Sequence, residues 1–129
     1  MTPAEELRAH ALRLPGAWED HPWGESVAKV GKKVFVFFGM PEAVAGPRFT
    51  VKLGGSLDEA LMMPWVTPAG YGLDRGGWVT VDAPQDAPLE MLVGWIEESY
   101  RAVAPKRLTA ELDARQSPLA GRLDVDHHR

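Results

Sequence analysis

Five cations in one stretch of the chain are the residues best suited to binding chemistry. Residues 21–52 contain five bases and two acids, whereas the whole sequence carries a net charge of −4. A hairpin tip can enter a groove of a duplex while nearby lysines contact phosphates, and such contacts set affinity and salt dependence without reading base sequence. The pattern therefore predicts weak, salt-dependent DNA binding by one basic surface. Its residues are Lys29, Lys32 and Lys33 on or beside a predicted hairpin tip, and Arg48 and Lys52 on the outward face of a neighbouring strand.

The same cations have a simpler interpretation. Lysines on an exposed hairpin edge stay solvated and deter strand-to-strand aggregation. A dedicated nucleic-acid binder more often has a domain pI above about 9, and residues 53–104 of this chain hold eight acids and two bases. The charge balance disfavours strong, non-specific DNA binding and leaves room for a local basic patch.

Residues that could act in catalysis or metal binding do not form a convincing cluster in the sequence. Asp20 and His21 are neighbours and could act as an acid/base pair, but no G-x-S-x-G motif accompanies any serine. His127 and His128 lie in a predicted frayed tail without a second ligand cluster. We therefore expect no enzyme, no cofactor and no metal.

A glycine-rich stretch, Gly54-Gly55-Ser56, precedes a predicted short helix. Backbone N–H groups at a helix start can bind phosphate. The stretch lacks the lysine and the spacing of a nucleotide-binding P-loop, so an N-cap at Ser56 is the favoured interpretation.

The size and composition indicate a single domain. A chain of 129 residues can build its own core without metals or disulfides. The absence of cysteine excludes disulfide scaffolds and thiol nucleophiles, and it fits a cytoplasmic protein. No window approaches the ~20 apolar residues that a membrane helix needs, so we expect no membrane association.

The longest predicted helix, over residues 88–103, organises the rest of the chain. Its apolar side carries Leu89, Leu92, Val93, Ile96, Tyr100 and Val103, and its polar side carries Glu90, Glu97 and Arg101. Met91 and Trp95 widen the apolar arc beyond what one sheet face can cover. Because large uncovered apolar patches are unusual on soluble monomers, we expect the C-terminal tail or a second copy to cover this flank. The alternative function is therefore a protein-interaction or homodimerisation module.

The remaining pattern predicts an α+β fold. A capping box of Thr2 and Glu5 begins a helix that ends near Leu14. A hairpin over 27–38 turns at Gly31-Lys32, with Phe35 and Phe37 on one face, and strands at 48–53 and 78–81 flank a short helix at 56–63. The expected order is roughly α-β-β-β-α-β-α, an antiparallel sheet with helices packed on one face. Loops at 17–26 and 64–77 separate these elements, the second anchored by Trp65 and Tyr71, and residues 108–129 form a weakly structured tail with at most one or two helical turns.

Short motifs spread through the chain resemble those of a known family. They are Leu14-Pro15-Gly16, Pro22-Trp23-Gly24, Thr50-Val51-Lys52-Leu53, the run from Pro68 to Val81, and Glu98-Ser99-Tyr100. In this order they resemble the MmcQ/YjbR-like family over residues 12–107. The resemblance implies a small α+β domain at residues 1–107 with an antiparallel sheet, often labelled DNA-binding because its hairpins have been likened to a pair of wings.

Overall fold

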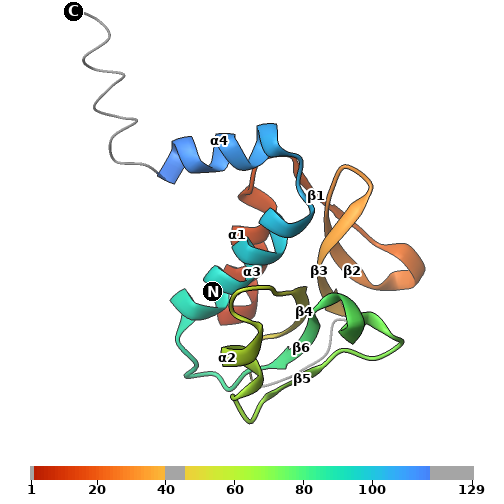
Figure 1. Cartoon of the computed structure of the whole chain (residues 1–129), viewed down its shortest axis with the longest axis vertical. Coiled ribbons are helices and arrows are strands. Elements are labelled where there is room, and N and C mark those ends of the chain that lie inside the picture. The colour runs from red at the N-terminus through yellow and green to blue at the C-terminus, as the bar shows by residue number, and fades with distance from the viewer. Residues whose placement is uncertain (1, 40–45, 117–129) are drawn as a thin grey trace, which may run out of the picture.

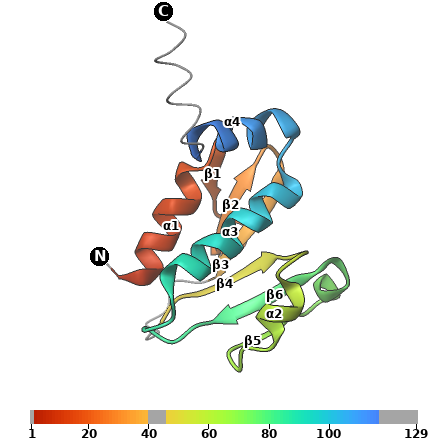
Figure 2. The same cartoon turned by 60° about the vertical axis from the view of Figure 1, so that its left-hand side comes forward.

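The computed structural model describes residues 2–39 and 46–116, which form a single α+β domain. Figure 1 labels its α-helices and strands. In chain order, with the two short 3-10 helices η1 and η2, the elements are α1 (Pro3–Arg13), β1 (Ala17–Asp20), η1 (Pro22–Gly24), β2 (Ser26–Val30), β3 (Lys33–Gly39), β4 (Arg48–Lys52), α2 (Leu57–Leu61), β5 (Val66–Pro68), η2 (Leu73–Gly76), β6 (Trp78–Asp82), α3 (Leu89–Val103) and α4 (Lys106–Gln116). Within this part of the chain, one antiparallel sheet has the strand order β1-β2-β3-β4-β6-β5. Helices α1 and α3 cover one face of its β1–β3 half, as Figure 2 shows. The predicted fold class is confirmed.

The two outermost strands, β1 and β5, lie in stretches that the sequence pattern assigned to loops. Each is short, and each has proline or glycine beside it, which hides the alternation typical of a strand. Pro68 closes β5 because proline has no N–H to donate and is tolerated at a sheet edge. Edge strands are stabilised by one neighbour and by little else, so the local sequence carries a weak signal for them.

The N-terminal helix follows its predicted pattern. Thr2 Oγ1 accepts a hydrogen bond of 3.1 Å from the N–H of Glu5, and the Glu5 carboxylate accepts one of 3.2 Å from the N–H of Thr2. Leu7, Ala11 and Leu14 then lie buried in the core. The capping box and the apolar face of α1 are confirmed.

The apolar arc of α3 is covered from within the chain. Trp95 is only 3% exposed, and the ring of Trp65 lies 5.9 Å from it. Met91 is partly buried against the same core. The expectation that the C-terminal tail or a second copy covers this flank is corrected: the segment that carries Trp65, between α2 and β5, does so. A pattern read along one helix does not reveal a tryptophan that arrives from another segment.

Helix α4 is longer than expected and docks on α1 and α3. It spans Lys106–Gln116, so the domain boundary predicted after Arg107 falls inside it. Glu97, which the periodicity placed on the solvent side of α3, is hydrogen-bonded to His10 Nε2 at 2.7 Å and accepts from Gln116 Nε2 at 2.8 Å. The rest of the predicted tail, including His127 and His128, lies outside the described residues.

Strands β3 and β4 pair only briefly, at Val36 with Val51 and at Phe37 with Thr50. On the Phe35 and Lys52 side of these pairs, the hydroxyl of Ser99 in α3 replaces the direct hydrogen bonds between the two strands. It donates to the Phe35 carbonyl oxygen at 2.5 Å and accepts from the N–H of Lys52 at 2.9 Å. The buried Ser99 therefore joins the two strands where their own hydrogen bonds stop.

A bulge in the β2–β3 pairing changes the predicted faces of β3. The register shifts between Ala28 and Lys29, opposite Phe35. Phe35 and Val36 are both fully buried, and the Phe35 ring meets Tyr100 edge-to-face at 5.3 Å. Strict alternation had put Phe35 on the face of Phe37; the extra residue of a bulge breaks that alternation.

Replacing Ser99 with alanine is expected to lower the free energy of unfolding by roughly 2–4 kcal/mol, because a part-buried N–H and a buried C=O each lose their partner at about 1–3 kcal/mol. Urea unfolding followed by circular dichroism measures this. Ala102→Ser, at an exposed position of the same helix, is the matched control and should change stability by less than about 0.5 kcal/mol. Equal effects of the two substitutions would contradict the bridging role.

Candidate functional site

The tip of the β2–β3 hairpin is an exposed cationic turn. Val30 pairs with Lys33 across the turn, and Gly31 has a φ of 60°, a left-handed conformation that glycine adopts without strain. Lys32 and Lys33 are exposed. The two-residue turn is confirmed, and it presents both lysines to solvent.

Lys29 is neutralised within the sheet. Its Nζ lies 2.7 Å from Asp20 Oδ2 and 5.3 Å from the centre of the Trp18 ring. Asp20 and Lys29 meet because β1 runs antiparallel beside β2. The hydrogen bond from Lys29, followed by the one from the His21 N–H, lowers the pKa of the Asp20 carboxyl.

The two side chains of the Asp20-His21 pair have different partners. The Asp20 carboxylate accepts from Lys29, whereas the Nε2 atom of His21 lies 3.3 Å from the carboxylate of Glu19. Between the two residues, the Asp20 carboxylate accepts a hydrogen bond of 2.8 Å from the backbone N–H of His21, and not from its imidazole ring. This arrangement is an ordinary surface network, and it gives no support to an acid/base pair.

Arg48 and Lys52 lie at opposite ends of β4. The alternating burial of Phe49 and Val51 confirms that both cations are on the outward face of the strand. Their cross-strand neighbours on β6 are Asp82 for Arg48 and Trp78 for Lys52. The structure therefore does not bring the five predicted cations together as one surface.

Helix α4 supplies two further cations at the hairpin end. A Cβ atom added to Gly16 would lie 2.9 Å from Leu108 Cδ1 and 3.8 Å from Val30 Cγ2, so the first turn of α4 lies beside the last residue of β2. Figures 1 and 2 both place α4 and the β2–β3 turn at the same end of the molecule. We call the exposed cations of this region the basic end: Lys32, Lys33, Lys106 and Arg107.

Among the described residues, no carboxylate lies within ion-pair distance of these four cations. The sequence pattern missed Lys106 and Arg107 because nothing local shows that α4 returns to the hairpin. A regional surplus of positive charge after residue 104 was the available signal.

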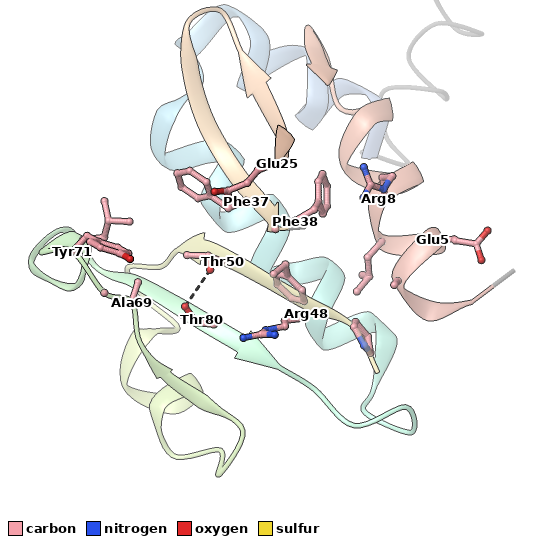
Figure 3. Close-up of a pocket in the computed structure, with 17 residues that line it drawn as sticks. Glu5, Arg8, Glu25, Phe37, Phe38, Arg48, Thr50, Ala69, Tyr71 and Thr80 are labelled. Carbon is pink, nitrogen blue, oxygen red and sulfur yellow. Dashed lines mark hydrogen bonds between the residues drawn. The ribbon is translucent and has the colours of Figure 1, made fainter. Parts of the chain in front are cut away.

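A cleft of about 600 Å³ opens at the Arg48 end of β4. Its walls are the first turns of α1, the end of β3, the start of β4, and the segment after β5 (Figure 3). The β3–β4 register contains no pair beyond Phe37 and Thr50 in this direction. The cleft therefore lies where the two strands part, on the side of their short ladder opposite Ser99.

Tyr71 stands exposed at one wall of the cleft. The sequence predicted that it anchors its loop, but its side chain is fully exposed, so this expectation was wrong. Its φ of 59° is left-handed, which is uncommon for a residue other than glycine. The loop holds an aromatic ring out toward the cleft at some cost in backbone conformation.

Arg8 forms a fixed part of the opposite wall. Its guanidinium lies 4.6 Å over the ring of Phe38 and donates hydrogen bonds to Glu19 and Ser26. Ser26 Oγ donates to Glu19 at 2.5 Å, and this bond is the main cause of a lowered pKa of the Glu19 carboxyl, with the charge of Arg8 adding to it.

The glycine-rich stretch before α2 does form an anion site, and the chain fills it with its own carboxylate. Glu98 accepts from the N–H groups of Gly54 at 2.7 Å and Ser56 at 3.1 Å, and from Ser56 Oγ at 2.7 Å. Ser56 is the N-cap residue of α2, as predicted, but its side chain makes no capping hydrogen bond to the helix. Partial burial raises the pKa of the Glu98 carboxyl, but these hydrogen bonds outweigh burial and the pKa lies below its usual value.

The geometry defines a small α+β domain with a basic end and a separate cleft, and comparison with known proteins places it in a family. The YjbR family model matches residues 12–102, and the chain belongs to that family. It is also similar to a crystal structure of Deinococcus radiodurans protein DR2400, described with the domain DUF419. That similarity has 27% identity and a TM-score of 0.64, and it covers 87% of this chain and 91% of the other. A search of curated proteins found no match.

Neither a metal-ligand cluster nor a membrane-spanning helix is found among the described residues. No group of three or more His, Asp or Glu side chains in the described ranges is arranged to hold a metal ion. Within the same ranges, no helix combines the length and apolar character needed to cross a bilayer.

Replacing Glu98 with glutamine is expected to cost about 1.5 kcal/mol of unfolding free energy at pH 7, since hydrogen bonds to a charged group are lost. Because the folded-state pKa is lowered, the carboxylate's contribution is complete above the usual pKa and disappears as pH falls through the folded value. Urea unfolding between pH 7 and pH 3 should therefore show the two proteins converging in acid.

The control for this series is Glu90→Gln, on the exposed side of the same helix. It should track the unsubstituted protein at every pH. A constant gap between the Glu98 variant and the unsubstituted protein across the range would contradict the charged interaction.

Proposed function

We propose that this chain is a non-enzymatic DNA-binding domain of the cytoplasm that contacts duplex phosphates with its basic end. The observation that carries the proposal is that Lys32 and Lys33 of the hairpin and Lys106 and Arg107 of α4 lie at the same end of the molecule. All four are exposed and have no carboxylate partner among the described residues. Cations that are not already paired can replace the counterions of a phosphate backbone.

The basic end refines the surface expected from sequence. Lys29 contributes little because Asp20 already neutralises it, and Arg48 lies at the far end of β4 beside the cleft. Lys52 remains on the outward face of β4, which is a different strand from those that carry the hairpin tip. The four cations of the basic end are therefore the first contacts.

The remaining charge of the protein keeps this binding weak. A net charge of −4 repels DNA from most of the surface, so the basic end supplies both the attraction and the orientation. Four phosphate contacts give a salt dependence with a log–log slope of about −3.6 and no base readout. The interaction alternative at Met91 and Trp95 lacks such support because Trp95 is buried beneath Trp65.

A fluorescence-anisotropy titration with a short labelled duplex, repeated over a salt series, tests this function. We expect Lys32→Glu/Lys33→Glu and, separately, Lys106→Glu/Arg107→Glu each to weaken binding at least about tenfold and to reduce the salt slope by about two, since each pair removes two phosphate contacts. Both pairs are exposed, so circular dichroism should be unchanged.

Arg75→Glu in η2 is the control for a charge reversal elsewhere on the surface, because Arg75 is exposed in the β5–β6 connection, which is not part of the basic end. It should leave the titration unchanged apart from a small general effect of net charge. Absence of binding at the lowest salt, or equal losses for Arg75 and for the basic end, would overturn the proposal.

A further inference from the structure

We infer that the cleft at the Arg48 end of β4 binds a small nucleotide-like molecule, a planar nitrogen heterocycle that carries an anionic group. This goes beyond DNA binding at the basic end, because it uses other residues at another place in the fold. The cleft volume of about 600 Å³ lies in the range of small-molecule sites, which combine apolar walls with a few convergent polar groups.

Four aromatic residues line the cleft: Phe49 is buried in the core, whereas Phe37, Phe38 and Tyr71 are partly or fully exposed. Phe37 is held edge-to-face against Trp78 at 5.4 Å, and Phe38 is held under the guanidinium of Arg8 at 4.6 Å. Tyr71 comes from the opposite wall, and Figure 3 shows its hydroxyl end directed toward the cleft. Fixed rings facing an exposed ring favour a flat, polarisable occupant that stacks on them.

The backbone at Tyr71 supports a binding role. Its side chain is fully exposed and so adds nothing to the core, yet the loop keeps it in a left-handed conformation. Residues held in such conformations cluster at ligand sites, where the strain is part of the arrangement. A packing role does not account for this residue, whereas stacking on a ligand does.

Polar groups select the rest of the ligand. Thr50 Oγ1 and Thr80 Oγ1 lie 3.1 Å apart on the cleft floor, and Figure 3 shows the Arg48 guanidinium beside them. A guanidinium has five N–H donors, so Arg48 can bind an anion in addition to its partner within the chain. The Arg48 guanidinium therefore favours a ligand that carries an anionic group.

The Glu25 carboxylate is the group that favours a nitrogen heterocycle as the flat part of the ligand. Its carboxylate lines the cleft near Phe37 (Figure 3), and within the described residues it takes part in no hydrogen bond or ion pair. A carboxylate beside aromatic rings is suited to accept N–H groups from the edge of a stacked base. A simple aromatic acid would leave it without a donor.

A ¹H–¹⁵N correlation titration of the full chain with adenosine 5′-monophosphate tests the inference, with adenosine and inorganic phosphate as partial probes. We expect the amide signals of Thr50, Ala69, Gly70 and Thr80 to shift, and the mononucleotide to bind at least about tenfold more tightly than either probe. Shifts confined to the basic end would mean phosphate binding there and would overturn the inference.

Two variants separate the parts of the site. Tyr71→Gly suits the left-handed backbone and is expected to keep the fold while weakening adenosine and its monophosphate alike, about tenfold. Arg48→Gln should reduce the affinity of the monophosphate to that of adenosine. An unchanged affinity in Tyr71→Gly would exclude the aromatic site.

Two controls keep this test distinct from that of DNA binding. Met62→Ser removes an apolar side chain that is 83% exposed outside the cleft, and it should leave mononucleotide binding unchanged. The Lys32→Glu/Lys33→Glu variant should also bind the mononucleotide normally. A loss of mononucleotide affinity in either variant would count against the cleft.

Discussion

The fold depends on three consecutive side chains of α3. Glu98 receives the N–H groups of the loop before α2, Ser99 joins β3 to β4, and the Tyr100 hydroxyl donates to the Pro15 carbonyl oxygen at 2.6 Å. Successive helix residues point in different directions, so one turn of helix reaches three separate segments. Each contact satisfies backbone groups that the neighbouring strands and helices leave unpaired. The helix thereby fixes how the β1–β3 half meets the half built from β4, β6 and β5.

These three contacts give a structural role to one of the motifs that resemble the family. Glu98-Ser99-Tyr100 was among the runs that resemble the family, and each of its side chains is engaged in holding the fold. Such residues specify an architecture, so family membership predicts the arrangement of the sheet and helices. Function is determined by side chains that the architecture leaves at the surface. The cations of the basic end and the polar groups around the cleft are surface side chains of this kind in position, outside the contacts that hold the fold.

The sequence predicted the features that neighbouring residues determine, and it missed the contacts between segments that are distant in the chain. The Thr2–Glu5 capping box, the Gly31-Lys32 turn and the outward placement of Arg48 and Lys52 follow from neighbouring residues alone, and all are present. The neutralisation of Lys29 requires β1 to pair with β2, and β1 had no recognisable pattern. The cover of Trp95, the occupant of the glycine-rich loop and the cleft likewise depend on contacts between distant segments. The exposure of Tyr71 runs against the usual burial of a loop aromatic, and such exceptions to local rules are found most often at functional or strained sites.

The cleft and the Ser99 bridge both arise from the short pairing between β3 and β4. Because β3 and β4 share only two residue pairs, the strands have to be joined or left open on each side. Ser99 joins them on the side toward Lys52, which allows the other side to part without loss of the connection between the halves. The cleft is lined by Phe37 of β3 and by Thr50 and Thr80 of the other half, so it spans the junction. The basic end belongs to the hairpin and α4 and lies entirely on the β1–β3 side of that junction. The two surfaces therefore draw on different parts of the framework, and a change in one can leave the other intact.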